Sequence, residues 1–131
     1  MKSLLTILLI FYLNFLNAQI EAIFDLKRFK SNDENYIETY LYIYGNSLKQ
    51  NKDTSDNDKG VEILQYIEDK ENKIIAHKKY VIKDKADYVE SKGIMDLQRF
   101  VVKSGEFKIF LELTDLNDPS NTVSYTHLTL P

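Results

Sequence analysis

Few side chains in this chain of 131 residues have the chemistry of a catalytic or metal-binding group, since it contains two His and no Cys. The absence of Cys excludes disulfides, thiolate zinc sites and cysteine nucleophiles. His77 stands beside two lysines in a segment whose alternation predicts a strand, and the sequence offers no partner that would fix its imidazole. We therefore interpret His77 as a solvent-facing strand residue.

Two acidic pairs are the next candidates for chemistry. Glu68 with Asp69, and Asp115 with Asp118, are of the residue type that glycoside hydrolysis places on either side of a cleft. Both pairs fall where a turn is expected, and Asp in a turn commonly accepts hydrogen bonds from its own backbone. We predict structural roles for these carboxylates.

A third acidic cluster lies in the polar stretch 49–59, where Asp53, Asp56 and Asp58 precede Gly60. A calcium loop needs oxygen ligands at fixed positions before its glycine, and counting back from Gly60 puts a lysine at one of them. Phosphate-binding loops, dinucleotide fingerprints, nucleophile elbows and zinc-protease motifs do not occur in the sequence. We expect no metal, no cofactor and no enzymatic activity.

Tyrosines form the most distinctive pattern. Tyr36, Tyr40, Tyr42 and Tyr44 share one side of a predicted strand, opposite an aliphatic side. Tyrosine combines apolar area with a polar tip, so this face is a possible binding surface for a sugar or a partner protein. The alternative, which we favour, is that the rings pack beneath a loop or against a further domain.

Arg99 is the remaining candidate for a ligand-binding side chain. We expect it instead to form an ion pair with a carboxylate at a strand end, such as Asp96 or Asp115. Its neighbours Met95 and Phe100 are expected in the core or at the edge of the core.

Alternation of apolar and polar residues predicts the elements that carry these side chains. Four strands with clear alternation, and two less regular ones, are expected over 37–44, 61–68, 74–82, 107–113, 21–29 and 94–102. Turn residues between them and little helical periodicity favour one all-β domain over residues 19–122. We predict an immunoglobulin-like antiparallel β-sandwich of about six to seven strands.

The N-terminal residues 1–18 predict a secretory signal-peptide helix. Lys2 precedes an uncharged run of roughly 13 residues, which is shorter than the ~20 that a spanning helix needs. Cleavage is expected after Ala18, with an uncleaved anchor or a buried helix as alternatives. We therefore expect an exported protein without a stable membrane span, located in the periplasm, at the outer membrane or outside a Gram-negative cell.

The C-terminal residues 123–131 (VSYTHLTLP) depart from the composition of the rest of the chain. They are similar to the translation of a transposon-end sequencing adapter, because the run GTC TCT TAT ACA CAT CTG ACG CTG CCG encodes them in order. We expect this segment to be an artefact, in which case His127 has no functional meaning. A natural final strand is the alternative, since Val, Tyr and Thr favour strands.

The net charge of the chain argues against one class of partner, nucleic acids. The chain has 17 Lys and Arg against 20 Asp and Glu, which gives a formal net charge of -3. A nucleic-acid-binding domain normally carries a basic patch, so no nucleic-acid partner is expected.

Three segments resemble one known family. YIETYLYIYGNSL (36–48), DLQRF (96–100) and SGEFKIFLELTDLNDP (104–119) are similar to the N-terminal region of secreted Bacteroidota proteins called GWxTD domain-containing proteins. The resemblance implies a β-sandwich-like region in a cell-envelope protein, followed by a domain with a Gly-Trp-x-Thr-Asp motif. This chain has no Trp, and the resemblance implies no reaction.

Two functional hypotheses follow. The first is a non-catalytic exported module that positions or docks a downstream domain of the same chain, or an envelope protein partner. The second is a stand-alone ligand-binding or adhesive module that uses the tyrosine face.

Overall fold

The computed structural model describes residues 19–31, 34–51, 58–84 and 93–129. Seven strands occupy most of these residues: β1 (Ala22–Lys30), β2 (Asn35–Ile43), β3 (Lys59–Glu68), β4 (Ile74–Asp84), β5 (Ile94–Val102), β6 (Phe107–Asp115) and β7 (Asp118–Thr129). A short 3-10 helix, η1 (Gly45–Ser47), follows β2. The predicted signal-peptide helix, residues 1–18, lies outside the described residues.

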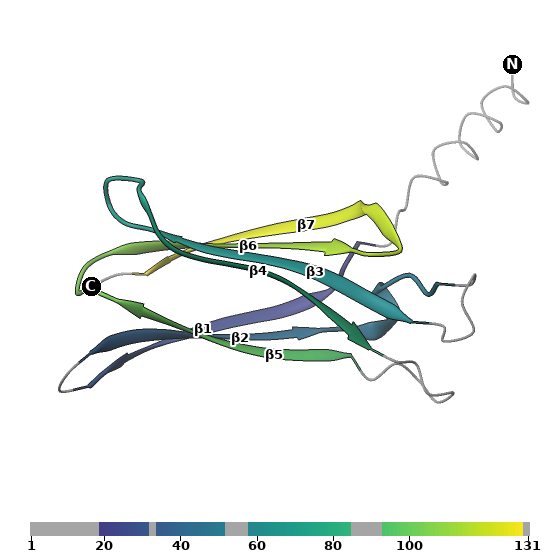
Figure 1. Ribbon diagram of the computed structural model, residues 1–131, viewed down its shortest axis with the longest axis horizontal. Helices are drawn as coiled ribbons and strands as arrows, with labels where there is room; N and C mark the ends of the chain where they lie inside the picture. Colours follow the sequence, from purple (N-terminus) through teal and green to yellow (C-terminus); the bar gives the residue numbers. More distant parts are fainter. Residues whose placement is uncertain (1–18, 32–33, 52–57, 85–92, 130–131) are drawn as a thin grey trace, which may run out of the picture.

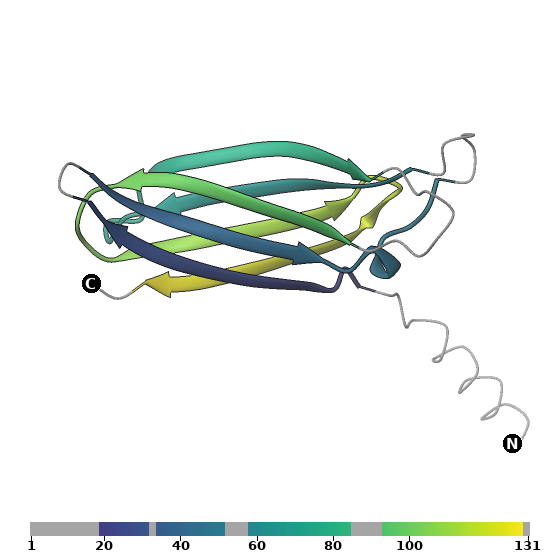
Figure 2. The same ribbon diagram turned by 90° about the horizontal axis from the view of Figure 1, so that it is seen from below.

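The strands form two antiparallel sheets that lie one above the other, with the orders β1-β2-β5 and β4-β3-β6-β7 (Figures 1 and 2). The predicted all-β sandwich is confirmed. The fourth strand pairs with the third, whereas constant-type immunoglobulin domains place it in the other sheet. Within the described ranges, no helix is long and apolar enough to cross a membrane.

Alternation places one side of each central strand in the core. In β6, for example, Phe107, Ile109, Leu111 and Leu113 are buried between the sheets, as their period of two predicts. The buried apolar residues fall into two clusters. One contains Ile20, Leu41, Ile43, Leu48, Val61, Ile63, Ile94, Leu111 and Leu113, and the other contains Ile37, Ile67, Phe100, Val102, Phe107 and Ile109.

The seventh strand, β7, is not among the six strands predicted from alternation. β7 starts at Asp118 and pairs with β6 as far as Thr129, so it includes most of the segment 123–131 that we expected to lie outside the fold. Pro119 is tolerated because β7 is an edge strand, where a missing N–H costs no ladder bond. Strand-forming Val, Tyr and Thr residues account for the pairing whatever their origin, so the adapter origin stays a prediction.

A polar bridge separates the two apolar clusters. Thr39 of β2 and Gln65 of β3 are fully buried, and the Thr39 hydroxyl donates to Gln65 Oε1 at 2.8 Å. Gln65 Nε2 in turn donates to the Tyr80 hydroxyl of β4 at 3.0 Å. This chain of bonds connects the central strands of the two sheets, and it satisfies polar groups that would be costly to bury alone.

The bridge continues to the side of the sandwich where the edges of β4 and β5 face each other. The Tyr80 hydroxyl donates to Asp96 of β5, and Gln98 Nε2 donates to the same carboxylate at 2.9 Å. Lys78 Nζ of β4 then reaches Gln98 Oε1 at 2.8 Å. Burial, and then the hydrogen bond to Asp96, raise the pKa of the Tyr80 hydroxyl well above its ordinary value. The hydroxyl therefore stays protonated and acts as a donor between the sheets.

The first prediction concerns the buried bond between Thr39 and Gln65. Thr39→Val or Gln65→Leu alone leaves a buried partner unpaired, and each is expected to lower the free energy of unfolding by about 1–3 kcal/mol. The double variant Thr39→Val/Gln65→Leu removes both groups and should cost clearly less than the sum of the single changes. Urea denaturation of the four proteins measures these values. Costs that add within about 0.5 kcal/mol would contradict the bond as described.

Candidate functional site

The tyrosine face is the outer surface of the three-stranded sheet. Because Ile37, Leu41 and Ile43 of β2 are buried, the alternate residues Tyr36 and Tyr42 point away from the core, with Glu38 and Tyr40 between them. In Figure 2 this sheet faces the viewer, and no other described segment crosses in front of its three strands. Gly93, just before β5, nevertheless packs against the hydroxyl end of Tyr42, since a Cβ at this glycine would come within 2.8 Å of that hydroxyl.

Register places residues from both neighbouring strands beside those of β2. The rows across the sheet, from β1 through β2 to β5, are Ile23–Tyr42–Met95, Asp25–Tyr40–Leu97, Lys27–Glu38–Arg99 and Phe29–Tyr36–Val101. We call the outward side chains of these rows, together with Tyr44, the outer β1-β2-β5 face.

Four aliphatic side chains of the outer β1-β2-β5 face are more than half exposed. Met95 is 81% exposed, Val101 60%, Ile23 55% and Leu97 54%. The outer face of the other sheet carries charged side chains on β3, β4 and β6, including an ion pair between Glu62 and Lys79 at 3.0 Å. Its large exposed apolar residues, among the described ones, are confined to β4. Among the described residues, the exposed apolar side chains of the outer β1-β2-β5 face therefore come from β1, from β5 and from Tyr44, whereas the other sheet exposes them on β4 and carries the stacked pair Tyr66 and Phe110 on β3 and β6.

Neighbouring side chains already pack against the rings of Tyr36 and Tyr42. Tyr36 stacks on Phe29 from β1 with ring centroids 5.1 Å apart, and the guanidinium of Arg99 from β5 lies 4.4 Å from the same ring. Tyr42 contacts Tyr44 edge to face at 5.0 Å. The rings therefore pack side by side along the sheet. This arrangement differs from a flat row of open ring faces.

A band of charge crosses the middle of the outer β1-β2-β5 face. Both Nε and Nη2 of Arg99 donate to Glu38 Oε1, at 3.0 and 2.6 Å, and the Tyr40 hydroxyl donates to Glu38 Oε2 at 2.5 Å. These bonds, first that from Tyr40 and then that from Arg99, lower the pKa of the Glu38 carboxyl. Lys27 Nζ lies 5.7 Å from the centroid of the Tyr40 ring. The carboxylate is thus held ionised by Tyr40 and Arg99, and Lys27 stands opposite Glu38 in the neighbouring strand.

The predicted partner of Arg99 is wrong. Arg99 pairs with Glu38 because the register between β2 and β5 puts the two residues directly opposite each other. Asp96 points to the other side of β5, where it accepts from Tyr80. Met95 was expected in or near the core and is instead exposed on the outer face, whereas Phe100 is buried as expected.

Sequence reasoning missed Ile23, Leu97 and Val101 as members of the face. In β5 both alternating sets contain apolar residues, so the period of two does not say which set faces inward. The polar bridge determines which set of β5 residues faces inward, because Asp96 and Gln98 bond to Tyr80 and Lys78 of β4. Charge in the sequence does not decide it either, since Arg99 lies in one set and Asp96 in the other.

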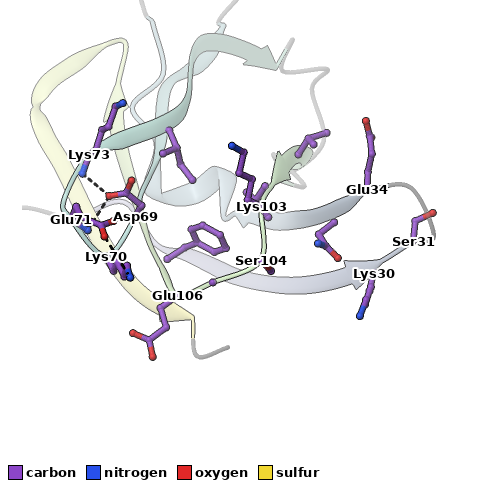
Figure 3. Close-up of a pocket in the computed structure, with 16 residues that line it drawn as sticks. Lys30, Ser31, Glu34, Asp69, Lys70, Glu71, Lys73, Lys103, Ser104 and Glu106 are labelled. Atoms are coloured by element: carbon purple, nitrogen blue, oxygen red, sulfur yellow. Dashed lines mark hydrogen bonds and ion pairs between the residues drawn. The ribbon is translucent and has the colours of Figure 1, made fainter.

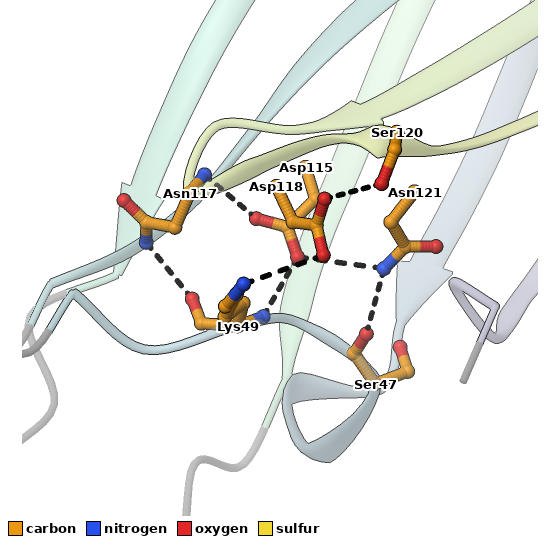
Figure 4. A network of polar contacts seen from close by, with 7 residues as sticks. All are labelled: Ser47, Lys49, Asp115, Asn117, Asp118, Ser120 and Asn121. Carbon is orange, nitrogen blue, oxygen red and sulfur yellow. Dashed lines mark hydrogen bonds and ion pairs between the residues drawn. The ribbon is translucent and has the colours of Figure 1, made fainter. Parts of the chain in front are cut away.

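Asp115 belongs to a polar knot at the end of the sandwich where β6 turns into β7 (Figure 4). Its carboxylate is fully buried and accepts from the backbone N–H of Lys49 at 2.7 Å and of Asn117 at 2.9 Å. The Asn117 side chain donates to the backbone oxygens of Lys49 and Asp58, at 2.8 and 2.9 Å. The knot therefore ties the segments before and after the polar stretch 49–59 to the β6–β7 turn.

Asn121 extends this knot toward the first strand. Its amide donates to Ser47 O at 3.4 Å, and its Oδ1 accepts from the backbone N–H of Ile20 at 3.0 Å. Asp118 is outside the buried part, where it accepts from Ser120 Oγ at 2.5 Å and lies 3.5 Å from Lys49 Nζ. The Ser120 hydroxyl is the main cause of the lowered pKa of the Asp118 carboxyl. Asp115 and Asp118 are thus each engaged by neighbouring groups of their own turn and the adjoining loop.

Asp69 has a similar role in the β3–β4 turn. Its Oδ1 accepts from the backbone N–H groups of Glu71 and Lys73, both at 3.0 Å, while Asn72 adopts a φ of 60°. His77 is exposed on the outer face of the four-stranded sheet, as expected. Asp53 and Asp56 lie outside the described residues. Among the described residues, no group of three His, Asp or Glu side chains could hold a metal ion.

A hollow of about 1010 Å³ lies at the opposite end of the sandwich from the polar knot (Figure 3). Lys30, Lys70, Lys73, Lys103, Glu34, Asp69, Glu71 and Glu106 contribute its charged side chains. The positive and negative groups balance, and no His is among the lining residues. The hollow therefore lacks the excess of one charge that would attract an ionic substrate.

No protein-family model matches the chain, and a search of curated proteins finds no match to it either.

The second prediction compares the two turn carboxylates. Asp115→Asn puts an amide against backbone N–H donors in a buried position, and it should lower the free energy of unfolding by about 2 kcal/mol. Asp118→Asn is the matched control and should change stability little, because this carboxylate is only partly buried, with its side chain 35% exposed. Thermal melts followed by circular dichroism compare both variants with the unchanged protein. Equal effects of the two substitutions would contradict the structural role of Asp115.

Proposed function

We propose that this chain is a non-catalytic, exported β-sandwich module of a Bacteroidota cell-envelope protein, and that it docks a further domain of that protein. The docking surface is the outer β1-β2-β5 face. The observation that carries the proposal is the set of four aliphatic side chains on that face that are each more than half exposed, Met95, Val101, Ile23 and Leu97, on either side of a charged row. Large exposed apolar patches on folded domains mark sites of association.

The energetics favour a protein partner of this kind. Met95, Leu97, Val101 and Ile23 are each more than half exposed, and covering each would contribute about 1 kcal/mol of hydrophobic stabilisation. Their contribution to folding is small, because the core is filled by the opposite sides of the same strands. A binding role gives these positions a reason to be apolar that folding does not supply.

The segments that carry the family resemblance support the same proposal. The 36–48 segment supplies the tyrosines of β2, and the 96–100 segment supplies Leu97 and Arg99 of β5. The 104–119 segment supplies Asp115 and its turn. Two of the three patterns therefore fall on the proposed docking surface, and the third falls on the polar knot.

Ring packing favours a protein over a sugar as the partner. Sugars bind to tyrosine through an open ring face, and Tyr36 has Phe29 and Arg99 against its ring. Four aliphatic side chains on the face are more than half exposed, which suits an apolar protein surface. A stand-alone sugar-binding or adhesive role for Tyr36, Tyr40, Tyr42 and Tyr44 is accordingly the less favoured proposal.

The third prediction tests docking with the expected downstream domain. Sequencing the locus beyond residue 122 supplies the coding region, and the next domain is expressed separately and titrated with the module by calorimetry. We expect binding that Leu97→Ser/Val101→Ser weakens at least about tenfold, because it removes two apolar contacts.

The control variant is Ile75→Ser/Val81→Ser, which removes two exposed aliphatic side chains from β4 on the other sheet. It should leave binding unchanged. A reading frame with no further domain would contradict the proposal, as would equal weakening by the two double variants.

A further inference from the structure

We infer that the partner that docks on the outer β1-β2-β5 face is a protein, and that its contacting surface carries a carboxylate between two aliphatic patches. This inference rests on the proposed docking function and specifies the chemistry of the partner. It follows from the distribution of apolar and charged groups along the face.

The apolar part of the face consists of two patches. The first surrounds Tyr42 and contains Ile23, Met95 and Leu97, and the second contains Phe29, Tyr36 and Val101. Leu97 and Val101 lie four residues apart on one strand, which corresponds to about 13 Å. A partner that covers both patches must therefore also cover what lies between them.

The charged row Lys27–Glu38–Arg99 lies between the patches. Glu38, the negative group of this row, lies beneath Arg99: the Glu38 side chain is 10% exposed, and the Arg99 side chain is 58% exposed. Both Glu38 oxygens already accept hydrogen bonds, one from Arg99 and the other from Tyr40. Asp25 is also on this face, in the next row, where its carboxylate accepts from the backbone N–H of Leu26 at 2.8 Å. Within the row itself, a partner meets the exposed Lys27 and Arg99 before it meets Glu38, while Asp25 adds one exposed carboxylate in the adjacent row.

Arg99 retains donors for such a partner. Its bonds to Glu38 use Nε and one N–H of Nη2, out of the five N–H donors of a guanidinium. A wholly aliphatic partner would bury the remaining donors unpaired, which costs binding energy. A carboxylate would accept from them and would also lie close to Lys27, so the charges would be complementary.

A displayed peptide library tests this chemistry without knowledge of the natural partner. Random 16-residue peptides on phage are selected on the module and counter-selected on the Leu97→Ser/Val101→Ser variant. The enriched peptides should carry Asp or Glu between two apolar clusters. Their affinity should fall at least about tenfold for Glu38→Gln/Arg99→Gln, which replaces the ion pair by neutral side chains of similar size.

Two controls keep the outcome clear. Circular dichroism melts establish that Glu38→Gln/Arg99→Gln is folded, and if it is not, the salt dependence of peptide binding to the unchanged module replaces it. Binding through a carboxylate should weaken between 50 and 500 mM NaCl (about a threefold change in Debye length), and binding through apolar contacts alone should not.

The possible failures are distinct. One outcome is that the enriched peptides depend on Leu97 and Val101 but lack an acidic residue and bind Glu38→Gln/Arg99→Gln as tightly as the unchanged module. This outcome would overturn the inference that the partner carries a carboxylate, and it would leave the proposed docking face intact. If instead every enriched peptide bound the Leu97→Ser/Val101→Ser variant as tightly as the unchanged module, the docking face and this inference would both fail.

Discussion

The buried hydrogen bond between Thr39 and Gln65 determines how the two sheets of this protein stack. Each residue occupies a core position at the centre of its strand, and neither has access to water. Shifting one sheet relative to the other would leave both groups buried and unpaired, at a cost of about 1–3 kcal/mol each. The bond therefore selects one alignment, and the two apolar clusters form on either side of it.

That alignment also decides which residues face outward. Tyr80, Asp96 and Gln98 continue the bridge to the edge of the sandwich, and this holds the polar side of β5 inward. Met95, Leu97, Arg99 and Val101 are consequently displayed beside the tyrosines of β2. The outer face is thus assembled by an interaction in the interior, and the module is a rigid support for a surface that its own folding does not need.

The parts that could be predicted from the sequence are those in which one strand alone carries the signal. β2 and β6 have one aliphatic and one polar side, so their strand type and buried sides followed from alternation. The sheet order, the partner of Arg99 and the knot around Asp115 depend on contacts between residues far apart in the chain. Arg99 and Glu38 are 61 positions apart, and Lys49 and Asp115 are 66 positions apart. The sequence therefore indicated a tyrosine face, but the aliphatic residues that dominate it required the register of three strands.

The oxidation rate of Met95 tests the central claim most directly. It is one of two methionines in the chain, the other being Met1, and it is 81% exposed on the proposed docking surface. Hydrogen peroxide treatment followed by mass spectrometry gives the rate of sulfoxide formation in the isolated module and in the full-length protein. If the outer β1-β2-β5 face is covered in the full-length protein, Met95 should oxidise at least about tenfold more slowly there. Equal rates in the two proteins would contradict docking on this face.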